Sequence, residues 1–319
     1  MKNFKGFLLA GIVLILAMGI FASAQDVTIG YSISTLNNAF FVGMTKGVEQ
    51  GGENMGVKIL TVNANGDSAK QAADVEDLIT KKVDAIIINP RDAEAIAPSV
   101  QKALDAGIPV FALDRGVTGV ELTGFLETDN IAMGRLAADL IAEALFEKYG
   151  KVEGEVIELG GLVGTTAARD REQGFHERLE SYPGINLVAS QPADFNQEKA
   201  YNVTTNLMLA NPNVDAIYGH NDDNTVGAAR ALKAMGKLVP AGKDGHIYIV
   251  GIDGIQQALD LIRAGSIDAT ISQEPVIMGE KAVEFAIAYL NGESFPSHFF
   301  TDFTAVEGYN IDHRSNWAE

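Results

Sequence analysis

The stretch Asp84-Ala85-Ile86-Ile87-Ile88-Asn89-Pro90 (84–90) contains four consecutive apolar residues between a carboxylate and an amide side chain. A short run that is apolar at every position is typical of a strand buried on both faces of a parallel sheet. A helical pattern precedes it at 68–81, another follows at 93–106, and the next apolar run occupies 108–113. This alternation predicts an open α/β sheet.

The alternation extends in both directions and divides the chain in two. The first half also has predicted strands at 27–33 and 57–62 and a helix at 40–55. After Asp129 the pattern begins again, with predicted helices at 131–148, 167–180, 197–209, 223–234 and 256–264 and predicted strands at 155–159, 186–189, 216–218, 247–252 and 269–272. A last helix at 276–290 precedes a C-terminal stretch expected to be irregular. Since 319 residues exceed one typical core, two domains are expected.

The two halves also share a pattern. Asp-Ala-Ile at 84–86 leads to Asn89 and, after a helix, to Asp114; Asp-Ala-Ile at 215–217 leads to Asn221 and, after a helix, to Asp253. A chance match between two α/β units is the alternative, because three-residue matches are common. In either case both halves offer an Asn and an Asp beyond the carboxyl ends of strands, where open α/β sheets bind ligands.

Further polar and aromatic residues lie at predicted strand ends. The candidate ligand-binding residues are Asn38, Phe40, Phe41, Asn89, Asp114, Arg115, Arg171, Phe195, Asn221, Asp253 and Gln273. This set suits a sugar, because Phe rings can stack on its C–H faces while the polar side chains bond to its hydroxyls. Taken singly, each residue has another explanation, such as core packing for Phe40 and Phe41 or turn formation for Asp114. Together they favour a binding site.

Composition excludes several other kinds of protein. The sequence has no cysteine, which excludes disulfides, thiolate metal sites and a cysteine nucleophile. Its net charge of −18 opposes binding to nucleic acid and favours a neutral ligand. The five histidines are dispersed, and neither a G-x-G-x-x-G nor a Walker pattern occurs, so no metal or cofactor is expected.

The N-terminus predicts secretion. Lys2 and Lys5 precede an apolar run at 7–22, and Ala22-Ser23-Ala24 follows with small residues at the cleavage-determining positions. These features predict a signal peptide at 1–24, removed before Gln25. An uncleaved anchor is the alternative, but the run is shorter than the ~20 residues needed to span a bilayer. Without a cysteine to carry a lipid anchor, we expect a protein that is retained in a periplasm.

Eight stretches resemble the ribose-binding members of the periplasmic sugar-binding protein family. They are STLNNAFF (34–41), INP (88–90), LDR (113–115), GTTAARDR (164–171), ASQPADF (189–195), ND (221–222), VGIDG (250–254) and ATISQ (269–273). The resemblance covers residues 25–304, and it implies that all eleven candidate residues contact the sugar. Ala39 departs from the family pattern, which commonly has Pro there, and 239–245 is longer than the corresponding turn.

The resemblance also implies an architecture and a role. The fold would be of periplasmic binding protein type I, with two Rossmann-like α/β lobes, parallel-sheet cores and a three-segment hinge. Residues 26–128 plus 274–302 would form the N-terminal lobe, and 129–273 plus 303–319 the C-terminal lobe. The chain would be a monomeric substrate-binding component of a sugar ABC importer. Its partners would be a monosaccharide, the importer's membrane permease and, as a further candidate, a chemoreceptor.

D-Ribose is the first candidate ligand, and allose, another pentose or a polyol are alternatives. A secreted glycosidase is the alternative from a different class, because Asp114 and Asp253 could face each other across a cleft. We expect Arg115 to keep the neighbouring Asp114 ionised, which favours hydrogen bonding over acid catalysis. A sugar-responsive repressor shares this fold, but it would need a DNA-reading segment where this chain has a predicted signal peptide.

Overall fold

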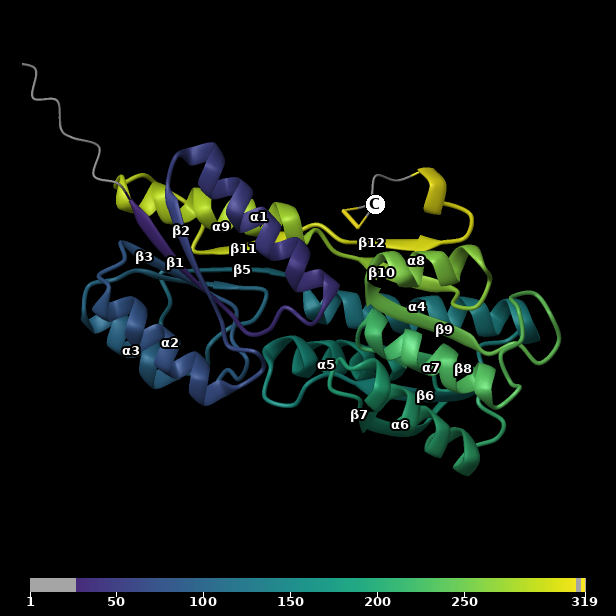
Figure 1. The fold of residues 1–319 in the computed structure, drawn as a ribbon. Helices are drawn as coiled ribbons and strands as arrows, with labels where there is room; N and C mark the ends of the chain where they lie inside the picture. Colours follow the sequence, from purple (N-terminus) through teal and green to yellow (C-terminus); the bar gives the residue numbers. More distant parts are fainter. Residues whose placement is uncertain (1–26, 314–316, 319) are drawn as a thin grey trace, which may run out of the picture.

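The computed structural model describes residues 27–313, 317 and 318, and the predicted signal peptide at 1–24 lies outside them. Two six-stranded sheets form the cores of two lobes, and each sheet has helices on both faces (Figure 1). The predicted fold class is confirmed. Among the described residues, no helix combines the length and the hydropathy needed to cross a membrane.

The first lobe is built on the sheet that contains the 85–88 run. Its strands lie in the order β2 (Lys58–Asn63), β1 (Thr28–Ile33), β3 (Ala85–Ile88), β4 (Val110–Leu113), β5 (Gly124–Thr128) and β11 (His298–Thr301), all parallel. The helices that cover the two faces are α1 (Ala39–Met55) with α9 (Pro275–Leu290), and α2 (Ser68–Thr80) with α3 (Ala97–Asp105). Because both faces are covered, β3 and β4 are buried at every residue.

The second lobe repeats this strand order. Its strands follow the order β7 (Ile185–Pro192), β6 (Gly154–Gly160), β8 (Ala216–Gly219), β9 (Tyr248–Asp253), β10 (Ala269–Ser272) and β12 (Thr304–Glu307). The first five are parallel, and β12 runs antiparallel to β10. Its helices are α4 (Asn130–Tyr149) and α5 (Thr166–Leu179) on one face, and α6 (Gln197–Ala210), α7 (Asp222–Ala234) and α8 (Gln256–Arg263) on the other. The shared order supports the repeat that the sequence suggested.

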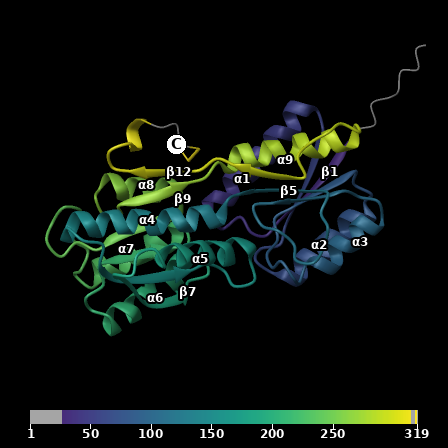
Figure 2. The ribbon, with the colours of Figure 1, turned by 180° about the vertical axis from the view of Figure 1, so that it is seen from behind.

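The chain passes between the sheets three times. It does so from β5 to α4, from β10 to α9 and from β11 to β12 (Figure 2). The hydroxyls of Thr128 and Thr301, at the ends of β5 and β11, lie 2.9 Å apart and share a hydrogen bond. Three crossings were expected at these places, while the exact lobe boundaries stay a prediction.

The prediction of an irregular C-terminal stretch was wrong. Residues 298–301 and 304–307 form β11 and β12, the last strand of each sheet, and η1 (Ile311–His313) follows. The β5 strand was also missing from the prediction. These three strands are short and mix apolar with polar residues, so their pairing with a neighbouring strand defines them more than their own pattern does.

Candidate ligand-binding site

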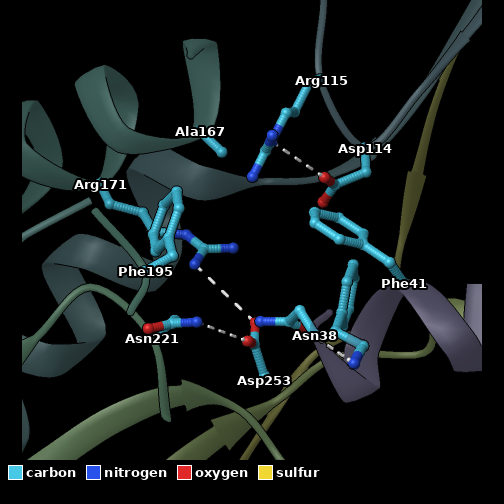
Figure 3. Close-up of a pocket in the computed structure, with 10 residues that line it drawn as sticks. Asn38, Phe41, Asp114, Arg115, Ala167, Arg171, Phe195, Asn221 and Asp253 are labelled. Atoms are coloured by element: carbon cyan, nitrogen blue, oxygen red, sulfur yellow. Dashed lines mark hydrogen bonds and ion pairs between the residues drawn. The ribbon is translucent and has the colours of Figure 1, made fainter. Parts of the chain in front are cut away.

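A pocket lies between the lobes, where the carboxyl ends of the two sheets meet (Figure 3). It encloses about 280 Å³, including space open to solvent. The lining residues are Asn38, Phe40, Phe41, Asp114, Arg115, Ala167, Arg171, Phe195, Asn221 and Asp253. Nine of the eleven candidate residues therefore line one pocket. The other two, Asn89 and Gln273, lie behind it and bond to its carboxylates.

In the first lobe, Asp114 directly follows β4. Its φ of 65° is the left-handed conformation, unusual for a residue other than glycine. Nδ2 of Asn89 donates a hydrogen bond of 3.1 Å to Oδ2 of Asp114, and Oγ of Ser34 donates one of 2.6 Å to Oδ1 of Asn89. The carboxylate is thus held by a buried chain of side chains before any ligand arrives.

The second lobe repeats this arrangement at Asp253, the last residue of β9. Its φ is 131°, and Nδ2 of Asn221 donates to its Oδ2 over 3.3 Å. Nε2 of Gln273 donates to Oδ1 over 2.8 Å. The Asn–Asp pair that the sequence repeat predicted in each half therefore exists in both lobes. A strained backbone at both carboxylates is typical of a functional position.

Two arginines complete the polar wall. Arg171 donates from Nε to Asn130 (2.9 Å) and from Nη1 to the carbonyl of His220 (2.6 Å), and its Nη1 lies 3.8 Å from Asp253. Arg115 donates from Nη1 to the carbonyl of Pro90 over 3.3 Å. Nε of Arg115 lies 3.6 Å from Asp114 and, although buried, has no hydrogen-bond partner within the part of the chain that the structure describes.

The aromatic residues supply apolar surface to the same pocket. Phe40 and Phe41 begin α1 and meet edge to face with centroids 5.7 Å apart. Phe195 comes from the other lobe, where Asp194 and Phe195 have φ values of 57° and 55°. Phe40 and Phe41 also belong to the hydrophobic core of the first lobe, and their contact with the sugar stays a prediction. Phe41 and Phe195 are drawn on different walls in Figure 3.

Burial is the largest influence on the pKa of each pocket carboxylate. It raises the pKa of Asp114, and this effect outweighs the opposing influence of Arg115, Arg171 and the Asn89 hydrogen bond. Burial also raises the pKa of Asp253 well above its ordinary value, against Arg171. Arg115 does lower the pKa of Asp114, but desolvation is the larger effect, so the net direction is upward. That Asp114 stays ionised beside Arg115 stays a prediction.

Other contacts join the lobes around the pocket. The backbone N–H of Gly116 donates to Oγ1 of Thr166, and that of Ala93 donates to the carbonyl of Gly164, both over 3.0 Å. With these contacts in place, Asp114 and Asp253 are each only 4% exposed. The structure is therefore a closed arrangement of the two lobes.

Three residues at this site are not among the eleven candidates from the sequence. Ala167 lines the pocket, Asp223 bonds to Asn38 of the other lobe, and Trp317 bonds to the backbone of Asp253. Asp223 directly follows the Asn221-Asp222 pair and could have been suspected from its place next to a strand end. Trp317 is the single tryptophan of the sequence, but its neighbours in the sequence do not indicate its contacts, because Phe40 and Asp253 are distant along the chain.

Comparisons with known proteins cover nearly the whole fold. The family described as "Periplasmic binding protein domain" matches residues 29–294. The ribose import binding protein of Haemophilus influenzae is 36% identical over 94% of this chain and 97% of its own. That of Bacillus subtilis is 38% identical over 84% and 83%. A solved ABC transporter periplasmic solute binding protein from Actinobacillus succinogenes, with bound D-allose, matches 90% of this chain and 100% of its own, with 32% identity and a TM-score of 0.81.

Proposed function

We propose that D-ribose is the ligand of this chain, which belongs to the periplasmic binding protein family and is a sugar-binding component of an ABC importer. Proteins of this family act in the periplasm with a membrane permease and are not enzymes, which removes the glycosidase alternative. The sugar would lie in the pocket of Figure 3 and the lobes would close around it.

One observation carries the proposal of a neutral polyhydroxyl ligand. Two buried polar atoms have no partner among the described residues: Nε of Arg115, which lines the pocket and can only donate, and Oε1 of Gln273, which lies behind the pocket and can only accept. A buried donor and a buried acceptor each need a hydrogen-bond partner, which a ligand group or a water molecule can supply. A hydroxyl can both donate and accept, so a sugar can satisfy a donor and an acceptor, directly or through a water molecule, without bringing a charge. The adjacent Phe41 and Phe195 can cover its C–H faces.

Ribose is preferred because both ribose import binding proteins resemble the chain at 36–38% identity. D-Allose is the second candidate, since the similar solved structure from Actinobacillus succinogenes holds it. The two pyranoses share the configuration of their ring hydroxyls, and allose carries an additional hydroxymethyl group. Discrimination between them therefore depends on the space at one ring edge, which is a packing property of the pocket.

Titration calorimetry on the mature protein tests the proposal, with D-ribose, D-allose, D-arabinose and ribitol as ligands. We expect ribose to bind with a Kd in the micromolar range or tighter, about −8 kcal/mol or better. Allose or ribitol binding ten times more tightly than ribose would contradict the choice of sugar. Failure of every carbohydrate in a wider thermal-shift panel would contradict the assignment of the pocket.

Three further points accompany the proposal. We propose that residues 1–24 are a cleaved signal peptide, which the mass of the periplasmic protein would test by placing the mature N-terminus at Gln25. The mature protein would be a monomer, to be checked by sedimentation with and without sugar. A chemoreceptor would be a second partner that binds the closed form. Loss of chemotaxis toward ribose in a strain that lacks this protein but still imports ribose would test this.

A further inference from the structure

Trp317 lies outside the pocket lining and yet contacts residues from both of its walls. Its Nε1 donates a hydrogen bond of 3.1 Å to the backbone carbonyl of Asp253, in the second lobe. Its ring meets that of Phe40, in the first lobe, edge to face, with centroids 6.1 Å apart and planes at 87°. Since Phe40 and Asp253 both line the pocket, one side chain bridges the two walls from behind.

The described residues that precede Trp317, at 304–313, belong to the second lobe. β12 pairs with β10, and Ile311 of the following η1 is buried in the second lobe's core. The Trp317 ring, in contrast, packs against the hydrophobic core of the first lobe. The contact therefore crosses between the lobes near the hinge.

Helix α1 provides the space for this ring at Gly43. A Cβ atom at this position would lie 2.9 Å from Cζ3 and 3.0 Å from Cε3 of Trp317, closer than side chains normally pack. Gly43 is buried and lies one turn after Phe40. The absence of a side chain at residue 43 thus lets the indole approach the helix next to the pocket.

The hydrogen bond acts on a strained part of the site. The backbone of Asp253 has φ 131°, and its carbonyl also accepts from the N–H of Gln273 over 3.2 Å. Holding this carbonyl from two sides fixes the peptide orientation that aims the Asp253 carboxylate into the pocket. A bond to the backbone at this point therefore influences a side chain that we propose contacts the sugar.

We propose that Trp317 is a positioning residue that stabilises the closed arrangement and slows release of the sugar. It would do so by joining Phe40 to Asp253 when the lobes meet. The inference rests on the proposed binding function but not on the identity of the sugar. An opening movement that separates the lobes would break the contact with Phe40, the contact with Asp253 or both, so the bridge would favour the closed state alone.

The protein provides its own spectroscopic probe, because Trp317 is the single tryptophan of the sequence. We expect its emission to shift to shorter wavelength as ribose is added, since closure buries the ring between the lobes. The midpoint of the shift should match the Kd from calorimetry. Saturation with sugar and no change in emission would overturn the inference while leaving the binding function intact.

Release kinetics test the role directly, by surface plasmon resonance on captured protein or by exchange of radiolabelled ribose. Trp317→Ala should increase the rate of sugar release about tenfold, with little change in the association rate, because both a hydrogen bond and an aromatic contact are lost. Trp317→Phe keeps a ring and should increase it about threefold. Tyr309→Ala is the matched control, since Tyr309 is an aromatic of the same segment that is 76% exposed, and it should leave release unchanged.

A double-mutant cycle separates positioning from general stability. Gly43→Ala should accelerate release in the wild type by displacing the indole, and should have little further effect in the Trp317→Ala background. Equal effects of Gly43→Ala in both backgrounds would contradict the proposed coupling. If Trp317→Ala lowers the melting temperature of the sugar-free protein and leaves release unchanged, the residue is structural only. If the wild type binds no sugar in calorimetry, the proposed function fails instead.

Discussion

Asn38 and Asp223 join the two lobes at the pocket through a hydrogen bond of 2.7 Å from Nδ2 of Asn38 to Oδ2 of Asp223. Each partner is also fixed within its own lobe. Oδ1 of Asn38 caps α1 by accepting from the N–H of Phe40 over 2.7 Å, and Oδ1 of Asp223 accepts from Nε2 of Gln197 over the same distance. The two groups therefore need little reorganisation to meet when the lobes close.

The first prediction concerns this interlobe bond. Asp223→Ala should weaken ribose binding about fivefold, or ~1 kcal/mol, because a bond made in the closed state is lost and the Asn38 amide is left without its partner. Calorimetry measures the change. Asp244→Ala is the control, since it removes an equal charge from an exposed loop. The same loss in both variants would indicate a general charge effect and contradict the specific role of Asp223.

The second prediction concerns the two carboxylates of the pocket. Asp114→Ala and Asp253→Ala should each weaken ribose binding by about 1.5–3 kcal/mol, a tenfold to hundredfold increase in Kd, because sugar hydroxyls and the neighbouring amides lose a partner. Calorimetry at constant pH gives the values, and circular dichroism checks the fold of each variant. Unchanged affinity in Asp253→Ala would remove Asp253 from the proposed contacts.

The third prediction is a pH dependence of stability that arises at Glu127, on β5 beside the hinge. Burial raises its pKa to about 8; the Asn130 hydrogen bond opposes this, and Asp170, Asp114 and Asp129 add to it. The folded state therefore holds the proton more tightly than the unfolded chain. The resulting stability is fully present below the ordinary pKa of a glutamate and is lost as the pH rises through about 8.

Urea unfolding at pH 5, 7 and 9 tests this sign. The free energy of unfolding should fall as the pH rises, and Glu127→Gln, which carries no charge at any of these values, should reduce the fall. Glu121→Gln is the control, because that glutamate is exposed in the same lobe. Parallel curves for Glu127→Gln and the wild type would show that Glu127 does not cause the dependence.

The fourth prediction concerns the close contact of α4 and α5, which carry Asn130 and Arg171 toward the pocket. A Cβ atom on Gly174 of α5 would lie 2.0 Å from the carbonyl oxygen of Ile131 in α4. Gly174→Ala must push the helices apart and should lower the free energy of unfolding by about 1–3 kcal/mol. Gly308→Ala, where a Cβ would meet no atom of the described residues within 4 Å, should change it little. Equal unfolding curves for the two variants would contradict the backbone contact.

Local sequence was sufficient for much of the fold and for most of the site. The continuous apolar run at β3 required a sheet covered on both faces, and the Asn and Asp residues after strands followed the rule for open α/β sheets. The structure brings these residues together because parallel strands end at the same edge. The net pKa direction at Asp114 could not be obtained in this way, since it depends on complete burial between two lobes.

The sequence alone determined most strands of each core, all except β5, β11 and β12, and the polar groups that follow them, because burial pattern and chain order are local properties. Only the tertiary structure decided that β11 and β12 complete separate sheets, that Asp223 meets Asn38 and that Trp317 reaches Asp253. These contacts join residues 64 to 185 positions apart. Which residues meet in these contacts depends on how the two lobes pack against each other, and a short stretch of sequence does not specify that packing.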